Sequence, residues 1–278
     1  MSQNFIMPSD IPDDQYPPPS AFVEEGKSCV EAAQKEGLIL KVMGGLGIYM
    51  HSQEFHPLWE GLERLGKKMF TDIDYVAYDK HRVKMIKFLE NRGFSVHQKL
   101  LYHYGKERQI YYGNTIPMVE VFYDRLAMNH TIEFAKRLEQ DSPTIPLSEL
   151  LLQKLQMVRM NEKDIKDSIL LLRAHNLADH DDNCINISII NSVLASNWGF
   201  YHTATSNLKM INESLGRYSV LTNEDREIIG ERIKALLRQV EGTPKSLKWK
   251  VRAKLGIKVI WYNEVDEWDV IETPPEEE

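Results

Sequence analysis

Apolar residues in the first half of the chain follow both helix and strand periodicities. The predicted helices cover residues 24–36, 46–53 and 80–92. The predicted strands are short runs rich in Val, Ile, Leu and Tyr, and they cover residues 38–43, 69–78 and 118–123. The region 94–112 is also strand-like, with 104–107 as a hairpin turn. This half therefore predicts mixed helix and strand.

After Pro146 the pattern becomes helical. Leu147, Leu151 and Leu155 fall on one helical stripe, and Asn161 can cap the helix that follows. The predicted helices of this half cover residues 147–158, 161–175, 185–195, 223–240 and 245–254. The second half is therefore expected to be a helical domain.

Together the two halves predict an α+β fold. A small mixed β-sheet with flanking helices is followed by an α-helical C-terminal domain, with the boundary between residues 141 and 146. Residues 1–20 are polar and contain Pro17-Pro18-Pro19, which predicts a disordered arm or one draped over the protein. The expected units are this arm over 1–20, a mixed catalytic domain over 21–145, a helical domain over 146–270 and an acidic tail over 271–278.

Composition narrows the class of protein. Of the 278 residues 42% are hydrophobic and 27% charged, which is typical of a globular protein. No apolar run reaches the ~20 residues that a membrane span needs, and the N-terminus does not resemble a signal peptide. Cys29 and Cys184 are distant in sequence and form no paired motif. These features predict a cytoplasmic protein that does not interact with membranes.

The formal net charge of −7 argues against a protein that coats nucleic acid. One basic stretch stands out, because residues 241–258 contain six basic residues and one acidic residue. With Trp249 it could contact RNA phosphates and stack on a base. The alternative, which the sequence favours, is an exposed amphipathic helix.

Gly44 and Gly45 follow a predicted strand and precede a predicted helix. A Gly-Gly turn lets the backbone approach a phosphate closely, and the first N–H groups of a helix add hydrogen-bond donors. Two adjacent glycines alone are more often an ordinary turn. The flanking strand and helix favour a phosphate-binding turn.

Two carboxylates, Asp72 and Asp74, lie at positions i and i+2 of the next predicted strand and therefore on one face. Such a pair can hold two Mg²⁺ ions roughly 3.5–4 Å apart. Burying two like charges in an apolar strand without a cation would be costly. Glu120, on a neighbouring predicted strand, is expected to complete the metal site and to assist as a base, with Asp124 on the same face as the alternative.

These segments carry a family resemblance. The runs VMGGLGIYMH, KKMFTDIDYVAY and MVEVFYDRL resemble the DNA polymerase β-like nucleotidyltransferase superfamily. The later run LLLQKLQMVRMNEKDIKDSILLL is similar to the branch of AbiEii-type toxin nucleotidyltransferases. The similarity spans residues 38–172. It implies Mg²⁺-dependent transfer of a nucleoside monophosphate from an NTP, with pyrophosphate as leaving group.

The same resemblance implies roles for three later residues. In that branch a lysine precedes an Arg/Lys-Asp-x-x-Asp segment, and Lys154, Asp164 and Asp167 occupy these positions here. Lys154 also interrupts an apolar stripe, so it needs an anionic partner such as a triphosphate unless its ammonium reaches water. Asp164 can instead favour the start of its helix. Asp167 can pair with Lys154 or orient a base.

The sequence departs from the family pattern before the two aspartates. Asp72 comes 27 positions after Gly45, so an inserted helix or loop is expected between them. Lys67-Lys68 stands where the family often has an arginine. No Val-Arg-Asp follows the glycines, which argues against tRNA 3′-end maturation, and no Gly-Lys-Ser/Thr follows them, which excludes a P-loop.

The acceptor is left open among tRNA, protein and a small molecule, and the basic C-terminal stretch slightly favours RNA. A toxin-like role would bring an antitoxin partner. A catalytically inactive nucleotide-binding module of the same fold is the alternative function. A zinc site is disfavoured, because the spacing of its candidate ligands is irregular; these are His175, His180, Asp181, Asp182 and Cys184.

Overall fold

The computed structural model describes residues 7–64 and 68–265. Its centre is a five-stranded mixed sheet with the strand order β1-β2-β5-β4-β3. The strands are β1 (Leu40–Val42), β2 (Ile73–Ala77), β3 (Ser95–Val96), β4 (Arg108–Tyr112) and β5 (Met118–Tyr123). Only the β2–β5 pair of this sheet is parallel. The fold is therefore mixed α+β.

The parallel pair sets the position of two acidic side chains. In its register Asp74 of β2 lies opposite Glu120 of β5. Ile73, Tyr75 and Val121 are fully buried around them, so the pair lies within an apolar sheet. Facing carboxylates at this depth follow directly from the strand register, which sequence alone does not give.

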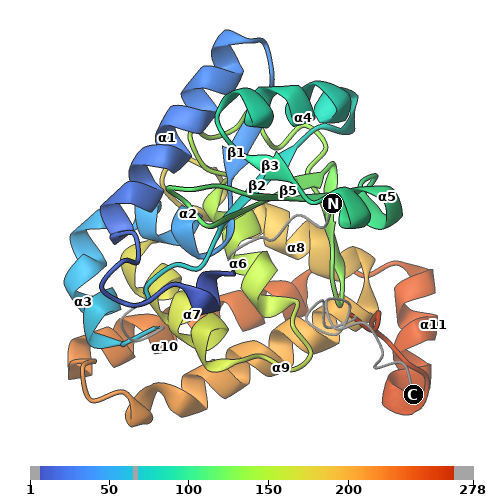
Figure 1. Cartoon of the computed structure of the whole chain (residues 1–278). Coiled ribbons are helices and arrows are strands. Elements are labelled where there is room, and N and C mark those ends of the chain that lie inside the picture. Colours follow the sequence, from blue (N-terminus) through green and yellow to red (C-terminus); the bar gives the residue numbers. More distant parts are fainter. Residues whose placement is uncertain (1–6, 65–67, 266–278) are drawn as a thin grey trace, which may run out of the picture.

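Helices cover both faces of the sheet. In Figure 1, α1 and α4 lie on one side of it and the helices of the C-terminal half lie on the other. The helices of the first half are α1 (Pro19–Lys35), α2 (Gly44–His51), α3 (His56–Gly61), α4 (Arg82–Asn91) and α5 (Gln98–Tyr104). The three predicted helices of this half are thus present, with shifted ends.

One predicted element is wrong. Residues 104–107 are not the turn of a hairpin, because α5 lies between β3 and β4. His97 caps this helix by accepting a hydrogen bond from the Leu100 N–H at 3.2 Å. Leu100 packs with Ile110 and Tyr112 in a small separate cluster. A short apolar run rich in Tyr and Leu fits the periodicity of a helix as well as that of a strand. Here the packing of Leu100 in this cluster favours the helix.

The segment expected to be a disordered arm has contacts from Met7 onward, whereas residues 1–6 lie outside the described residues. Pro8–Asp10 form a 3₁₀ helix, and Pro8 is buried. The Tyr16 hydroxyl donates to the Phe70 carbonyl at 2.9 Å. Pro18 immediately precedes α1, where a proline-rich entry suits a helix start because the first N–H groups have no partner within the helix. Of the two alternatives for this segment, residues 7–20 therefore show the draped arm and not the disordered one.

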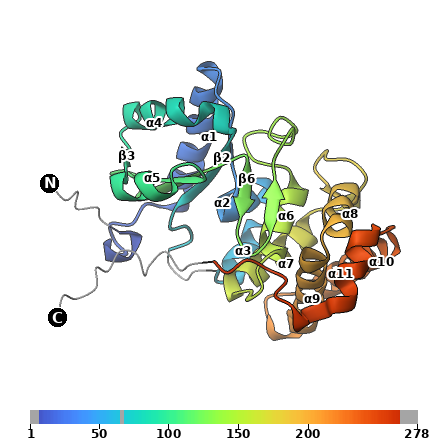
Figure 2. The same ribbon diagram turned by 90° about the vertical axis from the view of Figure 1, so that its right-hand side faces the viewer.

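The C-terminal half is helical, as predicted. Its helices are α6 (Leu147–Leu155), α7 (Glu162–Ala174), α8 (Ile187–Ser196), α9 (Trp198–Ser214), α10 (Asn223–Gly242) and α11 (Leu247–Leu255). One short strand pair accompanies them, β8 (Leu177–Ala178) with β9 (Ile185–Asn186), and a second pair, β6 (Arg125–Ala127) with β7 (Thr131–Glu133), closes the first half. Figure 2 shows α8 to α11 at the end of the molecule that is remote from α1 and α4.

The two halves share one hydrophobic cluster that extends from Phe22 in α1 to Val240 in α10. Between them, the expected boundary segment is attached to the sheet edge, where the Val42 N–H donates to the Pro143 carbonyl at 3.0 Å. The predicted acidic tail over 271–278 lies outside the described residues. Within the described part of the chain, every helix is too short or too polar to cross a membrane.

Candidate active site

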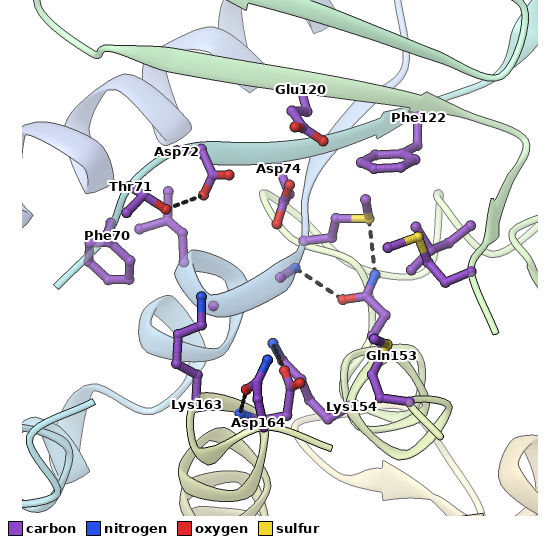
Figure 3. Close-up of a pocket in the computed structure, with 18 of the residues that line it drawn as sticks. Phe70, Thr71, Asp72, Asp74, Glu120, Phe122, Gln153, Lys154, Lys163 and Asp164 are labelled. Atoms are coloured by element: carbon purple, nitrogen blue, oxygen red, sulfur yellow. Dashed lines mark hydrogen bonds and ion pairs between the residues drawn. The ribbon is translucent and has the colours of Figure 1, made fainter. Parts of the chain in front are cut away.

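A cavity of about 300 Å³ lies where the sheet meets the helical half. Its walls come from the lead into β2, from β5, from the first turn of α2 and from α6 and α7. Figure 3 shows acidic side chains entering it from the sheet and cationic side chains from the helices below. Ligand pockets for small molecules start at about this volume.

Gly44 and Gly45 are the first two residues of α2, where the chain turns directly after β1. Gly44 has φ +64°, and a Cβ there would collide with the Asp74 carboxylate. A Cβ on Gly45 would press against the guanidinium of Arg64. Both positions therefore exclude larger residues for physical reasons. The backbone at this turn lies directly against one acidic and one basic group of the cavity.

Three carboxylates, those of Asp72, Asp74 and Glu120, reach the cavity from the sheet side, and Asp164 lines it from α7. Figure 3 shows Asp72 and Asp74 pointing into the same space, with Glu120 beside them from the neighbouring strand. Asp72 immediately precedes β2 and accepts a hydrogen bond from the Thr71 hydroxyl at 3.2 Å. The predicted set is thus brought together.

Asp124, the alternative third carboxylate, lies elsewhere. It follows β5 with φ +59° and accepts a hydrogen bond from the Asp79 N–H at 3.0 Å. It is exposed and borders a separate shallow pocket with Arg82 and Tyr123. The chain leaves the strand before Asp124, so the alternation that pointed to it ends one residue early.

Burial and mutual repulsion disfavour ionisation of the two inner carboxyls. Burial, followed by the negative charge of Asp72, raises the pKa of Asp74 to about 7. Burial raises the pKa of Glu120 to about 8, although the cation of Arg108 opposes this and lies 3.3 Å from Glu120 Oε1. Within the described residues the Asp74 carboxylate has no hydrogen bond or ion pair. A cation is the partner that such a group lacks.

The described residues include no group of three or more His, Cys, Asp or Glu already arranged around a metal position. The predicted cage of Asp72, Asp74 and Glu120 is thus not preformed. Mg²⁺ often binds to one or two carboxylates together with substrate phosphates and water. Asp72 and Asp74 fit that mode, because both expose oxygen ligands to a cavity large enough for phosphate.

Lys154 is held from behind the cavity. Its Nζ lies 3.1 Å from Asp164 Oδ1 and 2.9 Å from Asp167 Oδ2. Burial alone would lower the pKa of Lys154, but the two carboxylates raise it above its ordinary value. The Asp164 N–H donates to Asn161 Oδ1, so Asp164 also belongs to the start of α7 as expected. Lys154 is therefore a fully compensated cation.

Asp167 does not line the cavity. It is 1% exposed and also accepts two hydrogen bonds from Arg64, at 2.5 Å from Nε and 3.0 Å from Nη2. Burial raises its pKa, but Lys154 and Arg64 more than offset this and hold the pKa below the ordinary value. The sequence leaves two roles open for Asp167, pairing with Lys154 or orienting a base, and the structure has the pairing. The structure places it as the shared counter-ion of two cations.

Sequence analysis missed three residues of the site. Arg64 lies over the glycine turn, Gln153 Oε1 accepts a hydrogen bond from the Gly44 N–H at 3.1 Å, and Lys163 enters the cavity from α7. Figure 3 shows the Lys163 ammonium directed toward the acidic side of the cavity. Lys163 had a signal, since it fills the Arg/Lys place of the motif. Arg64 and Gln153 had none in the local sequence.

Of the two residues that stand at the place of the family's arginine, the one that the structure describes does not line the cavity. Lys67 lies outside the described residues, and the Lys68 ammonium turns away to the carbonyls of Pro8 and Ile11 at 2.9 and 2.8 Å. Arg64, eight positions before Asp72, is the arginine that borders the cavity.

The disfavoured zinc site is not formed among the described residues. Asp181 is paired with Arg137, with oxygen to nitrogen distances of 2.9 and 2.8 Å. His175 Nε2 lies 3.3 Å from the Ser52 hydroxyl. These side chains therefore connect helices and loops of the fold.

The raised pKa values predict that the free protein loses stability as pH rises. Between about pH 5 and 8 the unfolded chain has released protons that Asp74 and Glu120 still hold in the fold, so the free energy of unfolding falls with pH. We expect Asp74→Asn to raise this free energy at pH 8 by about 1–2 kcal/mol and to change it less at pH 5. Urea unfolding at the two pH values measures both.

Asp124→Asn is the matched control, since it removes a carboxylate outside the cavity and retains the oxygen that accepts the Asp79 N–H. It should leave the pH dependence as it is in the unaltered chain. If the free energy of unfolding of Asp74→Asn fell with pH as steeply as that of the unaltered chain, Asp74 would not be the group that holds the proton in the fold.

Comparison with known protein families and with curated protein sequences finds no match.

Proposed function

We propose that the protein is a Mg²⁺-dependent nucleotidyltransferase that moves a nucleoside monophosphate from an NTP to an acceptor hydroxyl. One observation carries the proposal. Asp72, Asp74 and Glu120 converge in a single cavity opposite the Gly44-Gly45 turn. The buried Asp74 carboxylate, which has no ion pair among the described residues, lies beside a glycine turn that opens a helix, and this combination suits a metal-bound triphosphate.

Each wall of the cavity would contribute one part of the chemistry. Asp72 and Asp74 would hold Mg²⁺, which neutralises phosphate charge when it is bound. The first turn of α2 offers N–H groups that have no acceptor within the helix. Lys163 would contact the phosphates as the cation that enters the cavity without an ion pair among the described residues. Arg64 and Lys154, both paired with the buried Asp167, would support this wall from behind.

Glu120 fits the proton acceptor. Its pKa of about 8 lies near working pH, where a general base is most effective. It would take the proton of the acceptor hydroxyl as that oxygen forms its bond to the α-phosphorus. The bond from the α-phosphorus to the bridging oxygen then breaks, and pyrophosphate leaves with that electron pair.

Radiolabelled NTPs test this function. The full chain is incubated with Mg²⁺, an NTP labelled on the α- or the γ-phosphate, and bulk tRNA, lysate protein or an aminoglycoside panel as acceptor. We expect α-label but not γ-label to be transferred, with release of pyrophosphate and complete loss in EDTA.

Transfer of γ-label would indicate a kinase and contradict the proposal. Thermal stabilisation by NTP and Mg²⁺ without any transfer would favour the inactive nucleotide-binding module. The four NTPs are compared separately, because the cavity walls do not show which base is preferred.

A further inference from the structure

Large aliphatic side chains are exposed along α11 and the segment that follows it. Their exposed fractions range from 47% to 78%, and they are Leu247, Val251, Leu255, Ile257, Val259 and Ile260. Exposed lysines flank them, at Lys248, Lys250, Lys254 and Lys258. These ten residues are called the basic-apolar patch. A contiguous apolar surface bordered by charge of one sign is typical of a binding surface.

The opposite side of α11 is fixed to the protein body. The Trp249 indole donates to the Leu194 carbonyl at 3.2 Å and meets the Tyr201 ring edge-on. Arg252 lies over the Trp198 ring at 4.6 Å. Leu247, Val251 and Leu255 recur every four residues on the outer side, so they form one stripe. Trp249 is thus occupied, which removes the aromatic that was considered for stacking on an RNA base.

The patch carries charge of one sign. Residues 242–263 contain six basic residues and no acidic residue. The segment 266–278, which lies outside the described residues, has the opposite composition, with seven acidic residues and no Lys or Arg. Without it the chain has 34 acidic and 34 basic residues, so this segment carries the entire formal net charge of −7. It also contains Trp268, Val270 and Ile271.

The described chain leaves α11 and ends beside the sheet, where Glu264 and Val265 line a pocket with Tyr104 and Arg108, and its length still allows the acidic segment to return to the patch. Asn263 is anchored to Asn129, whose carbonyl accepts from the Asn263 N–H and whose side-chain amide donates to the Asn263 carbonyl, both at 2.9 Å. Ten residues join Leu255 to Val265, so these two are at most about 36 Å apart. The 13 residues after Val265 can span up to about 45 Å and therefore reach α11.

We propose that segment 266–278 binds the basic-apolar patch of its own chain. Its aliphatic and aromatic side chains cover the exposed aliphatic residues, and its carboxylates pair with the flanking lysines. Charge, apolar content and length all match, and no other partner is needed to cover the surface. The segment thereby competes with any external polyanion for these lysines.

Zero-length carbodiimide cross-linking of the full chain tests this, because it joins carboxylates only to lysines in direct contact. We expect cross-links from Glu272 or Glu276 to Lys254 or Lys258 in the monomer, with a yield that is independent of dilution and lower in 0.5 M NaCl. Val251→Asp combined with Leu255→Asp keeps both lysines and should lower the yield roughly tenfold. Val83→Asp, at an isolated residue that is 77% exposed on α4, is the matched control.

Three results would overturn the proposal. Cross-links confined to pairs of chains would indicate a second copy as the occupant. Cross-links to Lys163 would place the segment at the cavity. A yield that the α11 substitutions leave unchanged would exclude the patch as the binding surface.

Discussion

Asp74→Asn should lower nucleotide transfer by about a thousandfold or more. The substitution keeps the shape of the side chain and removes one of the two charges expected to hold Mg²⁺ at the glycine turn. Asp74 is the central carboxylate, with Asp72 beside it and Glu120 opposite it in the β2–β5 register. Initial rates of α-label transfer at saturating NTP and Mg²⁺ measure the loss.

Asp124→Asn serves again as the control and should keep the rate within about twofold, because its side chain lies outside the cavity. Asp74→Asn is also expected to stabilise the free protein at pH 8. The same urea experiment therefore shows whether an inactive variant is folded or has lost activity by unfolding. Transfer that persists in a folded Asp74→Asn protein would remove the proposed mechanism.

Glu120 should behave differently from Asp74 if it is the base. Its pairing with Arg108 at 3.3 Å shows that its position can accept a positive neighbour without a metal. Asp74 and Glu120 come from the same sheet, and both have raised pKa values. Only the surroundings of each carboxylate can therefore decide which one binds the metal and which one acts as the base.

The elements that present the site were predictable because their signals are local. A strand ended by two glycines, an Asp-x-Asp strand and MVEVFY each lie within ten residues, and the structure has β1, β2 and β5 there. The register that sets Asp74 opposite Glu120 is not local, since the two strands are parallel and 40 residues of other structure separate them. The sequence could therefore supply the carboxylates but not their facing arrangement.

The misses have physical causes of two kinds. Helix α9 was missed although Phe200, Ala204, Leu208 and Ile211 recur at helical spacing, because Gly, Thr and Asn between them lower the helix propensity. Arg64 was missed because its role arises only from packing, where its guanidinium meets Gly45 and Asp167 from distant parts of the chain. Contacts between residues that are distant in the chain produce no periodic pattern in the sequence.

Asp167→Ala should destabilise the protein by about 3–5 kcal/mol. The carboxylate is 1% exposed and neutralises both Lys154 and Arg64, at 2.9 and 2.5 Å. Its removal leaves two buried cations of which, among the described residues, only Lys154 keeps an ion pair, that with Asp164, and an unpaired buried charge is far more costly than a missing pair. Urea unfolding at pH 7 measures the loss of unfolding free energy.

The matched control is Glu231→Gln, which breaks an exposed pair with Lys234 and should cause no measurable change. Because the pKa of Asp167 lies below its ordinary value, its contribution is present near neutral pH and is lost as pH falls through that pKa. The difference between Asp167→Ala and the unaltered chain should therefore shrink in acid.

Adding Lys154→Met to Asp167→Ala should recover part of the stability, since it removes one of the two uncompensated cations. Recovery would show that the ion pairs of Lys154 and Asp167 stabilise the contact between α6 and α7 beneath the glycine turn. It would also show that these pairs fix the position of Lys154. If the double variant is no more stable than Asp167→Ala, the cost arises from lost packing instead, and Lys154 would then have to act directly in the cavity.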